Sequence, residues 1–143
     1  MNAIVVGTDG SPGAEAAVQK VIELASGSPD ATVHLVCAYP GLSAMERIGM
    51  TVRQDPADLR GVAADVLARD ERRFREAGFA VEKHAREGDP AHVIIDVAEE
   101  QDAGMVVVGA RGNAGGGARF TLGGVASKLA HHVARSLLIV RED

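Results

Sequence analysis

The chain has 143 residues, a length that fits one domain with a substantial buried core, so we expect residues 1–143 to form a single domain. Its net charge of -5 argues against general nucleic-acid binding, because that function depends on a basic face that neutralises phosphates. Aromatic residues make up only 3% of the chain and tryptophan is absent. The core must therefore be aliphatic, as in many parallel α/β sheets.

The first part of the chain predicts a strand, a helix and a second strand. Short aliphatic runs at residues 3–7 and 31–38 are typical of buried strands. In the turn between them, Asp9 or Ser11 can cap a helix, and Pro12 suits its first turn. Apolar residues then recur at helical spacing, at Ala14, Ala17, Val18, Val21 and Leu24.

The middle of the chain predicts a loop, a long helix and an edge strand. Residues 39–55 are irregular and rich in turn residues, which favours a loop or lid. Residues 56–77 have the spacing of a helix, and the strict alternation at 79–86 indicates an edge strand. The expected apolar face of the helix consists of Leu59, Val62, Ala63, Val66, Phe74 and Ala77.

The last part of the chain predicts two further helices and two strands. The motif at 88–90, Gly-Asp-Pro, supplies a turn, a cap and a first-turn proline for a helix with its apolar face at Val93, Ile94, Val97 and Ala98. Strands are expected at 105–108 and 137–140. The final helix begins at Gly123 or Gly124, and its apolar face consists of Val125, Leu129 and Val133.

This element order predicts a doubly wound, Rossmann-like α/β sandwich: a five-stranded parallel sheet with helices on both faces. Right-handed crossovers give the strand order 3-2-1-4-5. Ligands of such sheets bind beyond the carboxyl ends of the strands, where the winding direction reverses. Here that switch point lies between the first and fourth strands.

A glycine-rich loop follows the fourth strand at this switch point. Seven of the chain's 17 glycines fall between Gly109 and Gly124, and no acidic residue occurs from Ala103 to Val140. Bare backbone N–H groups, a helix N-terminus and local positive charge are what a phosphate needs. The segment therefore predicts an anion-binding loop.

Several nucleotide-binding and phosphate-related motifs are missing. No Gly-Lys-Ser/Thr triplet ends a Walker A loop, and residues 7–10, Gly-Thr-Asp-Gly, lack the GxGxxG spacing of a dinucleotide site. A phospho-acceptor receiver domain needs a lysine after its fifth strand, where this chain has Arg141.

We expect a cytoplasmic protein without a membrane span, because the chain lacks a signal peptide pattern and an apolar run of 18–20 residues. The single cysteine, Cys37, lies in an apolar run and is expected to be a buried thiol. His34, His84 and His92 show no metal-ligand spacing. The adjacent His131 and His132 diverge on a helix, so no metal ligands are predicted.

Three segments of this sequence resemble the universal stress protein family. Residues 4–11 are similar to its first strand and Asp-Gly-Ser turn, and residues 88–90 match its frequent Gly-Asp-Pro. Residues 107–112 with 122–125 resemble the nucleotide signature of its ATP-binding branch. The likeness covers nearly the whole chain. It implies the adenine nucleotide alpha hydrolase-like form of the fold and a homodimeric stress-response factor that binds ATP with Mg²⁺.

The resemblance also implies which residues bind. Thr8 and Asp9 would hold the ribose or adenosine end, and the backbone near Ala38 would meet the adenine edge. Val108, Gly109, Arg111 and Gly112 would approach the ribose and phosphates, and Gly123, Gly124 and Val125 would cradle the phosphate tail. The dimer would form through the last strand, Leu137, Leu138, Ile139 and Val140.

Two departures from the family signature keep alternatives open. Ten residues separate Gly112 from Gly123, one more than the signature has, and Gly124 occupies the position of a serine or threonine. The hydrogen bond that a hydroxyl at this position would donate to a phosphate is therefore lost. Ser127, about one turn further along the helix, is a candidate to replace it in part. The alternatives are an interaction module of the same fold that binds no nucleotide, or a slow ATPase. Catalytic residues are not predicted, because no base stands beside the phosphates.

Overall fold

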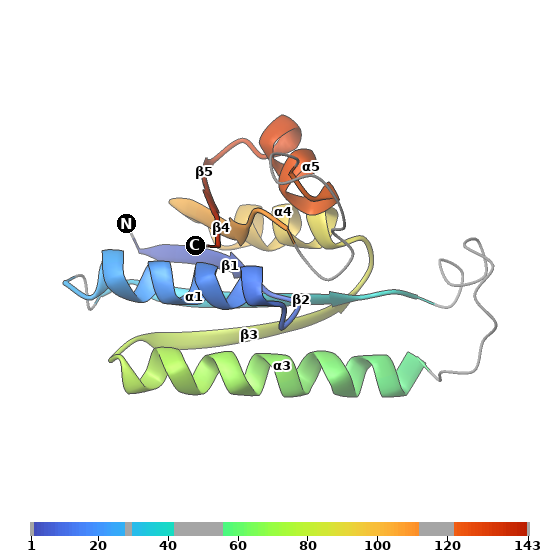
Figure 1. Cartoon of the computed structure of the whole chain (residues 1–143), viewed down its shortest axis with the longest axis horizontal. Coiled ribbons are helices and arrows are strands. Elements are labelled where there is room, and N and C mark those ends of the chain that lie inside the picture. Colours follow the sequence, from blue (N-terminus) through green and yellow to red (C-terminus); the bar gives the residue numbers. More distant parts are fainter. Residues whose placement is uncertain (1, 28–29, 42–55, 112–121, 143) are drawn as a thin grey trace.

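Five parallel strands form one sheet in the predicted order 3-2-1-4-5 (Figure 1). A computed structural model describes residues 2–27, 30–41, 56–111 and 122–142. Most of the loop predicted at 39–55 lies outside these residues. The strands are β1 Ala3–Gly7, β2 Thr32–Tyr39, β3 Ala80–Glu87, β4 Met105–Gly109 and β5 Ser136–Val140.

Helices cover both faces of the sheet, which makes the described chain a three-layer sandwich. The helices are α1 Pro12–Ala25, α3 Pro56–Glu76, α4 Pro90–Glu100 and α5 Gly124–His132. Helices α1 and α3 pack on one face, and α4 and α5 pack together on the other. Figure 1 shows α4 and α5 together at the top of the view and α3 at the bottom. Within the described part of the chain, no helix combines the length and the apolarity that a membrane span requires.

The core is aliphatic and divided in two by the sheet, because successive strand residues point to opposite faces. Val6 of β1 packs toward α1 and α3, whereas Val5 packs toward α4 and α5, and neither side chain is exposed. On the side of α1 and α3, Phe74 and Phe79 pack edge to face with ring centroids 5.7 Å apart. The predicted aliphatic core is therefore confirmed.

Two residues were assigned to the wrong face of their helices. Leu24 and Val62 are 63% and 61% exposed, although both were expected on apolar faces. In α1 the neighbouring Ala25 packs on the core instead. In α3 the buried stripe runs through Ala63, Leu67, Asp70 and Phe74, and Val62 points about 100° away from Ala63.

The other differences lie at the ends of the helices. Ala77 is exposed just beyond α3, and Val133 lies one residue past the end of α5. Its N–H still donates to the carbonyl of Leu129 at 2.9 Å, but its backbone is already extended and leads toward β5.

Two glycines let α1 approach the end of β4 closely. A Cβ on Gly109 would lie 2.6 Å from the backbone carbonyl of Gly13, closer than side-chain atoms approach in proteins. A Cβ on Gly13 would in turn overlap the carbonyl oxygen of Arg111. Because both clashes are with backbone, neither is relieved by a side-chain rotation. The first turn of α1 is thus held against the fourth strand.

Gly109→Ala is expected to lower the free energy of unfolding by about 1–3 kcal/mol, the usual cost of overpacking. The matched control is Gly124→Ala, because a Cβ there meets open space. Urea denaturation of both variants measures the difference. Equal stability of the two variants would contradict this packing.

The Cys37 thiol is buried in the sheet, as predicted, with 5% of the residue exposed. Burial raises the pKa of this thiol to about 11, and the negative charges of Asp9 and Asp70 add to the rise. A higher pKa leaves less thiolate at a given pH, and the thiolate is the reactive form.

Native Cys37 is therefore expected to react with a disulfide reagent at pH 8 on the order of 100 times more slowly than an ordinary cysteine. The measurement is the reaction rate in buffer and after unfolding in urea. Similar rates in the two conditions would show that the thiol is accessible in the native protein.

Candidate functional site

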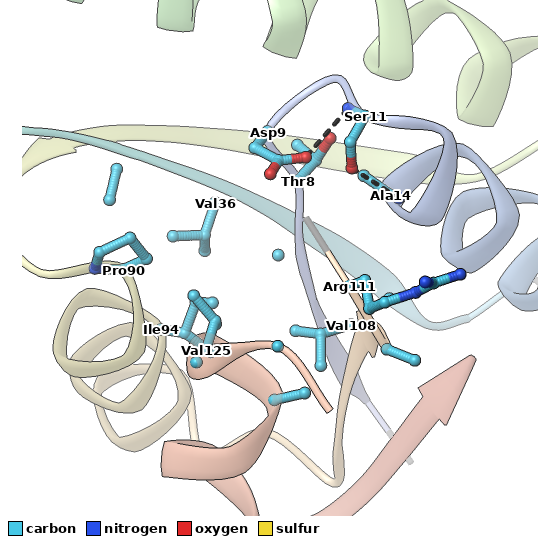
Figure 2. Close-up of a pocket in the computed structure, with 17 residues that line it drawn as sticks. Thr8, Asp9, Ser11, Ala14, Val36, Pro90, Ile94, Val108, Arg111 and Val125 are labelled. Atoms are coloured by element: carbon cyan, nitrogen blue, oxygen red, sulfur yellow. Dashed lines mark hydrogen bonds between the residues drawn. The ribbon is translucent and has the colours of Figure 1, made fainter. Parts of the chain in front are cut away.

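A cavity of about 310 Å³ opens at the carboxyl ends of β1 and β4, where the predicted switch point lies. That volume is at the lower end of the range of small-molecule sites. Segments far apart in the sequence meet here, as Figure 2 shows. The lining residues are Gly7, Thr8, Asp9, Ser11, Ala14, Val36, Ala38, Pro90, Ile94, Val108, Gly109, Ala110, Arg111, Gly123, Gly124, Val125 and Ala126.

The β1–α1 turn forms one wall of the cavity and is fixed by its own hydrogen bonds. The Ser11 hydroxyl caps α1 by accepting from the Ala14 N–H at 3.2 Å. The Asp9 carboxylate accepts from the Ser11 N–H at 2.9 Å. Gly10 has a φ of +78°, a conformation that favours glycine. Ser11 rather than Asp9 is thus the helix cap, and the Asp9 carboxylate lies at the cavity.

The buried carboxylate of Asp70 on α3 binds the β1–α1 turn through Thr8. The Thr8 hydroxyl donates to Asp70 Oδ2 at 2.7 Å and accepts from the Gly10 N–H at 3.3 Å. Asp70 is 1% exposed, and the Arg69 guanidinium lies 3.6 Å from its Oδ1. A buried charge needs such partners. Thr8 and Asp70 therefore couple α3 to the wall of the cavity.

The opposite wall is the start of α5, which offers backbone donors. Gly123 is the N-cap residue, and it has no side chain that could cap this helix. The Gly123 N–H donates to the Ala110 carbonyl at 2.7 Å, which ties the helix start to the end of β4. The first N–H groups of a helix have no partner inside the helix and attract anions. Gly124 and Val125, which line the cavity, supply such groups.

Helix α4 adds an apolar side to the cavity through Pro90 and Ile94. Its N-cap, Asp89, accepts from the His92 N–H at 3.2 Å and from the Lys128 ammonium of α5 at 3.1 Å. Burial favours a higher pKa for Asp89, but these hydrogen bonds and the charge of Lys128 lower its pKa overall. The ion pair joins α4 to α5 beside the cavity.

Nine of the predicted site residues line this cavity: Thr8, Asp9, Ala38, Val108, Gly109, Arg111, Gly123, Gly124 and Val125. The tenth, Gly112, lies outside the described residues. Ser127, considered as a substitute hydroxyl, is not among the lining residues. In Figure 2 the Arg111 side chain extends toward α1 and away from Pro90 and Ile94. The roles given to all these residues stay predictions.

Sequence reasoning missed several lining residues, chiefly the apolar ones such as Val36 and Ile94. A usable signal was present for α4, because its Gly-Asp-Pro start predicts a helix N-terminus at the same edge of the sheet. Ile94 lies one turn after Pro90 and so faces the same side.

Known proteins of similar sequence and structure identify the family. The universal stress protein family model matches residues 1–141. Universal stress protein Sll1388 from Synechocystis is 33% identical over 105 residues, which cover 72% of this chain and 68% of that protein. Universal stress protein E from Escherichia coli K12 is 32% identical over 136 residues, or 90% of this chain. The match spans only 41% of the E. coli protein.

A solved universal stress protein, in complex with cAMP, superposes with a TM-score of 0.74 at 26% sequence identity. The superposition covers 97% of this chain and 96% of that one. The family model covers nearly the whole chain, and the relative from Synechocystis and the solved structure agree with it. This chain belongs to the universal stress protein family.

Proposed function

We propose that this protein binds an adenine nucleotide, ATP with Mg²⁺, in the cavity between β1 and β4. It acts as a cytoplasmic, homodimeric stress-response factor. One observation contributes most: a carboxylate and a helix N-terminus face the same cavity from separate elements. Asp9 lies on one wall, and Gly123, Gly124 and Val125 lie on another. A nucleotide has hydroxyls at one end and phosphates at the other, which is the complementary pattern.

The adenosine end of the ligand is assigned to the β1–β2 side of the cavity. Val36 and Ile94 give an apolar surface against which a base can pack. The Asp9 carboxylate is the type of group that accepts hydrogen bonds from ribose hydroxyls. Ala38, near the end of β2, brings backbone to the rim where the adenine edge would lie.

The phosphate end is assigned to the start of α5. The backbone N–H groups there can donate to phosphate oxygens, and the helix dipole favours negative charge. Gly124 has no Cβ, and the space beside it is open. Mg²⁺ would be held mainly by the phosphate oxygens, as is usual for this ion with nucleotides.

One comparison supports the choice of ligand. The solved relative at 26% identity was crystallised with cAMP, an adenine nucleotide.

Gly124→Ser is expected to strengthen ATP binding by roughly 10-fold or more, because a hydrogen bond to a charged group contributes about 1.5–3 kcal/mol. Gly124→Ala is the matched control, since it makes the same backbone change without a hydroxyl. Calorimetric titration with ATP and Mg²⁺ gives the three affinities. Equal affinities of the serine and alanine variants would contradict phosphate binding at α5.

The same titration on the unmodified protein, with ATP, ADP and AMP, tests the proposal as a whole. Heat and saturation with at least one of them are expected. If none binds, the chain is instead an interaction module of the universal stress protein fold. Among the described lining residues Asp9 is the one acidic side chain, and it is assigned to the ribose, so at most slow hydrolysis is expected.

We also propose that two copies pair through β5. This edge strand contains Leu137, Leu138 and Ile139, all half-buried. The other edge strand, β3, has charged residues along its length, which protects an edge from pairing. Of the two edge strands, β5 is therefore the one expected to pair with a second copy of the chain.

Light scattering after size-exclusion chromatography is expected to give twice the chain mass at micromolar concentration. Leu138→Glu should shift the protein toward monomer. Val62→Glu is the control, because Val62 is exposed on α3, which packs over β2 and β3 at the other edge of the sheet. A monomer for the unmodified chain would rule out the pairing.

A further inference from the structure

Two histidines and a glutamate meet near the β3 edge, on the side of the sheet that α4 covers. The strand register places His34 of β2 opposite Glu82 of β3. Glu82 and His84 lie two residues apart on one strand, so they point to the same face. Val36, which is opposite His84, packs in the α4 layer, and this fixes the face.

The potential ligand atoms of the three residues converge. His34 Nδ1 lies 3.0 Å from His84 Nε2 and 3.4 Å from Glu82 Oε2, and all three atoms lie within 4.8 Å of one another. Tetrahedral bonds of about 2.0–2.2 Å place neighbouring ligand atoms roughly 3.3–3.5 Å apart. The two spacings from His34 are close to that, so an ion could be bound after side-chain rotations that adjust Glu82 and His84.

Burial is graded across the cluster in a way that suits an ion site. The His34 side chain is 4% exposed and is fixed within the sheet, whereas the Glu82 side chain is 60% exposed and opens to solvent. An ion could therefore enter from the β3 edge and keep solvent in its remaining positions. Buried ligands on rigid strands hold their geometry better than ligands on loops.

Positive charges around the cluster are balanced. Arg86, on the same face of β3, is paired with Glu100 of α4 through bonds of 2.8 and 2.6 Å. Lys83 points to the other face and pairs with Glu71 at 3.2 Å. Glu82 is thus the carboxylate that faces the two imidazoles.

We propose that His34, Glu82 and His84 form a binding site for a divalent transition-metal ion of the zinc class. Two imidazoles and one carboxylate are the donors that such ions prefer, and three protein ligands leave a position for solvent. The ion would replace the hydrogen bond between the two rings, and each ring would keep a proton on its other nitrogen. None of the three residues lines the cavity between β1 and β4, so this site is independent of nucleotide binding.

The test is a Zn²⁺ titration of the chelator-treated full chain against a competing chromophoric chelator, with Co²⁺ absorption as a report of geometry. One equivalent is expected to bind with micromolar or tighter affinity, and Co²⁺ is expected to show tetrahedral or five-coordinate bands. His84→Gln and Glu82→Gln change partly exposed residues, and each is expected to weaken binding by about 10–100-fold or more.

His92→Gln is the control, because His92 is an exposed histidine beside Asp89 on α4, apart from the three proposed ligands. It should leave the affinity unchanged. Thermal melts with and without Zn²⁺ give a second measure, with a rise of about 5–10 °C expected at a hundredfold excess over Kd. Absence of a saturable site in the unmodified chain, or equal affinity in His84→Gln, would overturn the proposal and leave a hydrogen-bonded histidine pair.

Discussion

The cavity depends on the parallel pairing of β1 with β4, two strands that lie about 100 residues apart in the sequence. Ile4, Val5 and Val6 pair with Met105, Val106 and Val107. This pairing brings the β1–α1 turn and the start of α5 to one edge of the sheet. The close backbone contact between Gly13 and Gly109 then holds α1 against β4. Each wall of the cavity is thus supported by the sheet itself.

Three helices begin at this cavity, and they begin in different ways. Ser11 and Asp89 cap α1 and α4 with side chains, whereas α5 begins at Gly123 without a side-chain cap. The missing hydroxyl at Gly124 therefore leaves backbone N–H groups as the donors at α5. In the proposed complex, phosphates would therefore contact backbone N–H groups at the position where the family signature has a hydroxyl.

Most of the fold could be predicted from the sequence, because each strand is a short aliphatic run and each helix has a clear start. The glycine-rich loop and the switch point predicted where the cavity lies, and the resemblance to the family implied nine of its lining residues. The face of α3 was harder: Val62 and Leu67 are both apolar, and only tertiary packing decides that Leu67 is buried. Asp70 was missed because a buried carboxylate with a threonine partner 62 residues away has no local signal.

The histidine cluster was missed for a related reason. His34 and His84 are 50 residues apart in the sequence, and it is the pairing register of β2 with β3 that brings their rings together.

A crystal structure grown with ATP and Mg²⁺ tests most directly whether the cavity binds a nucleotide. Electron density is expected with the adenosine near Asp9 and Ala38 and the phosphates at the N–H groups of Gly124 and Val125. An empty cavity at saturating ATP, or phosphates bound away from α5, would contradict the proposal.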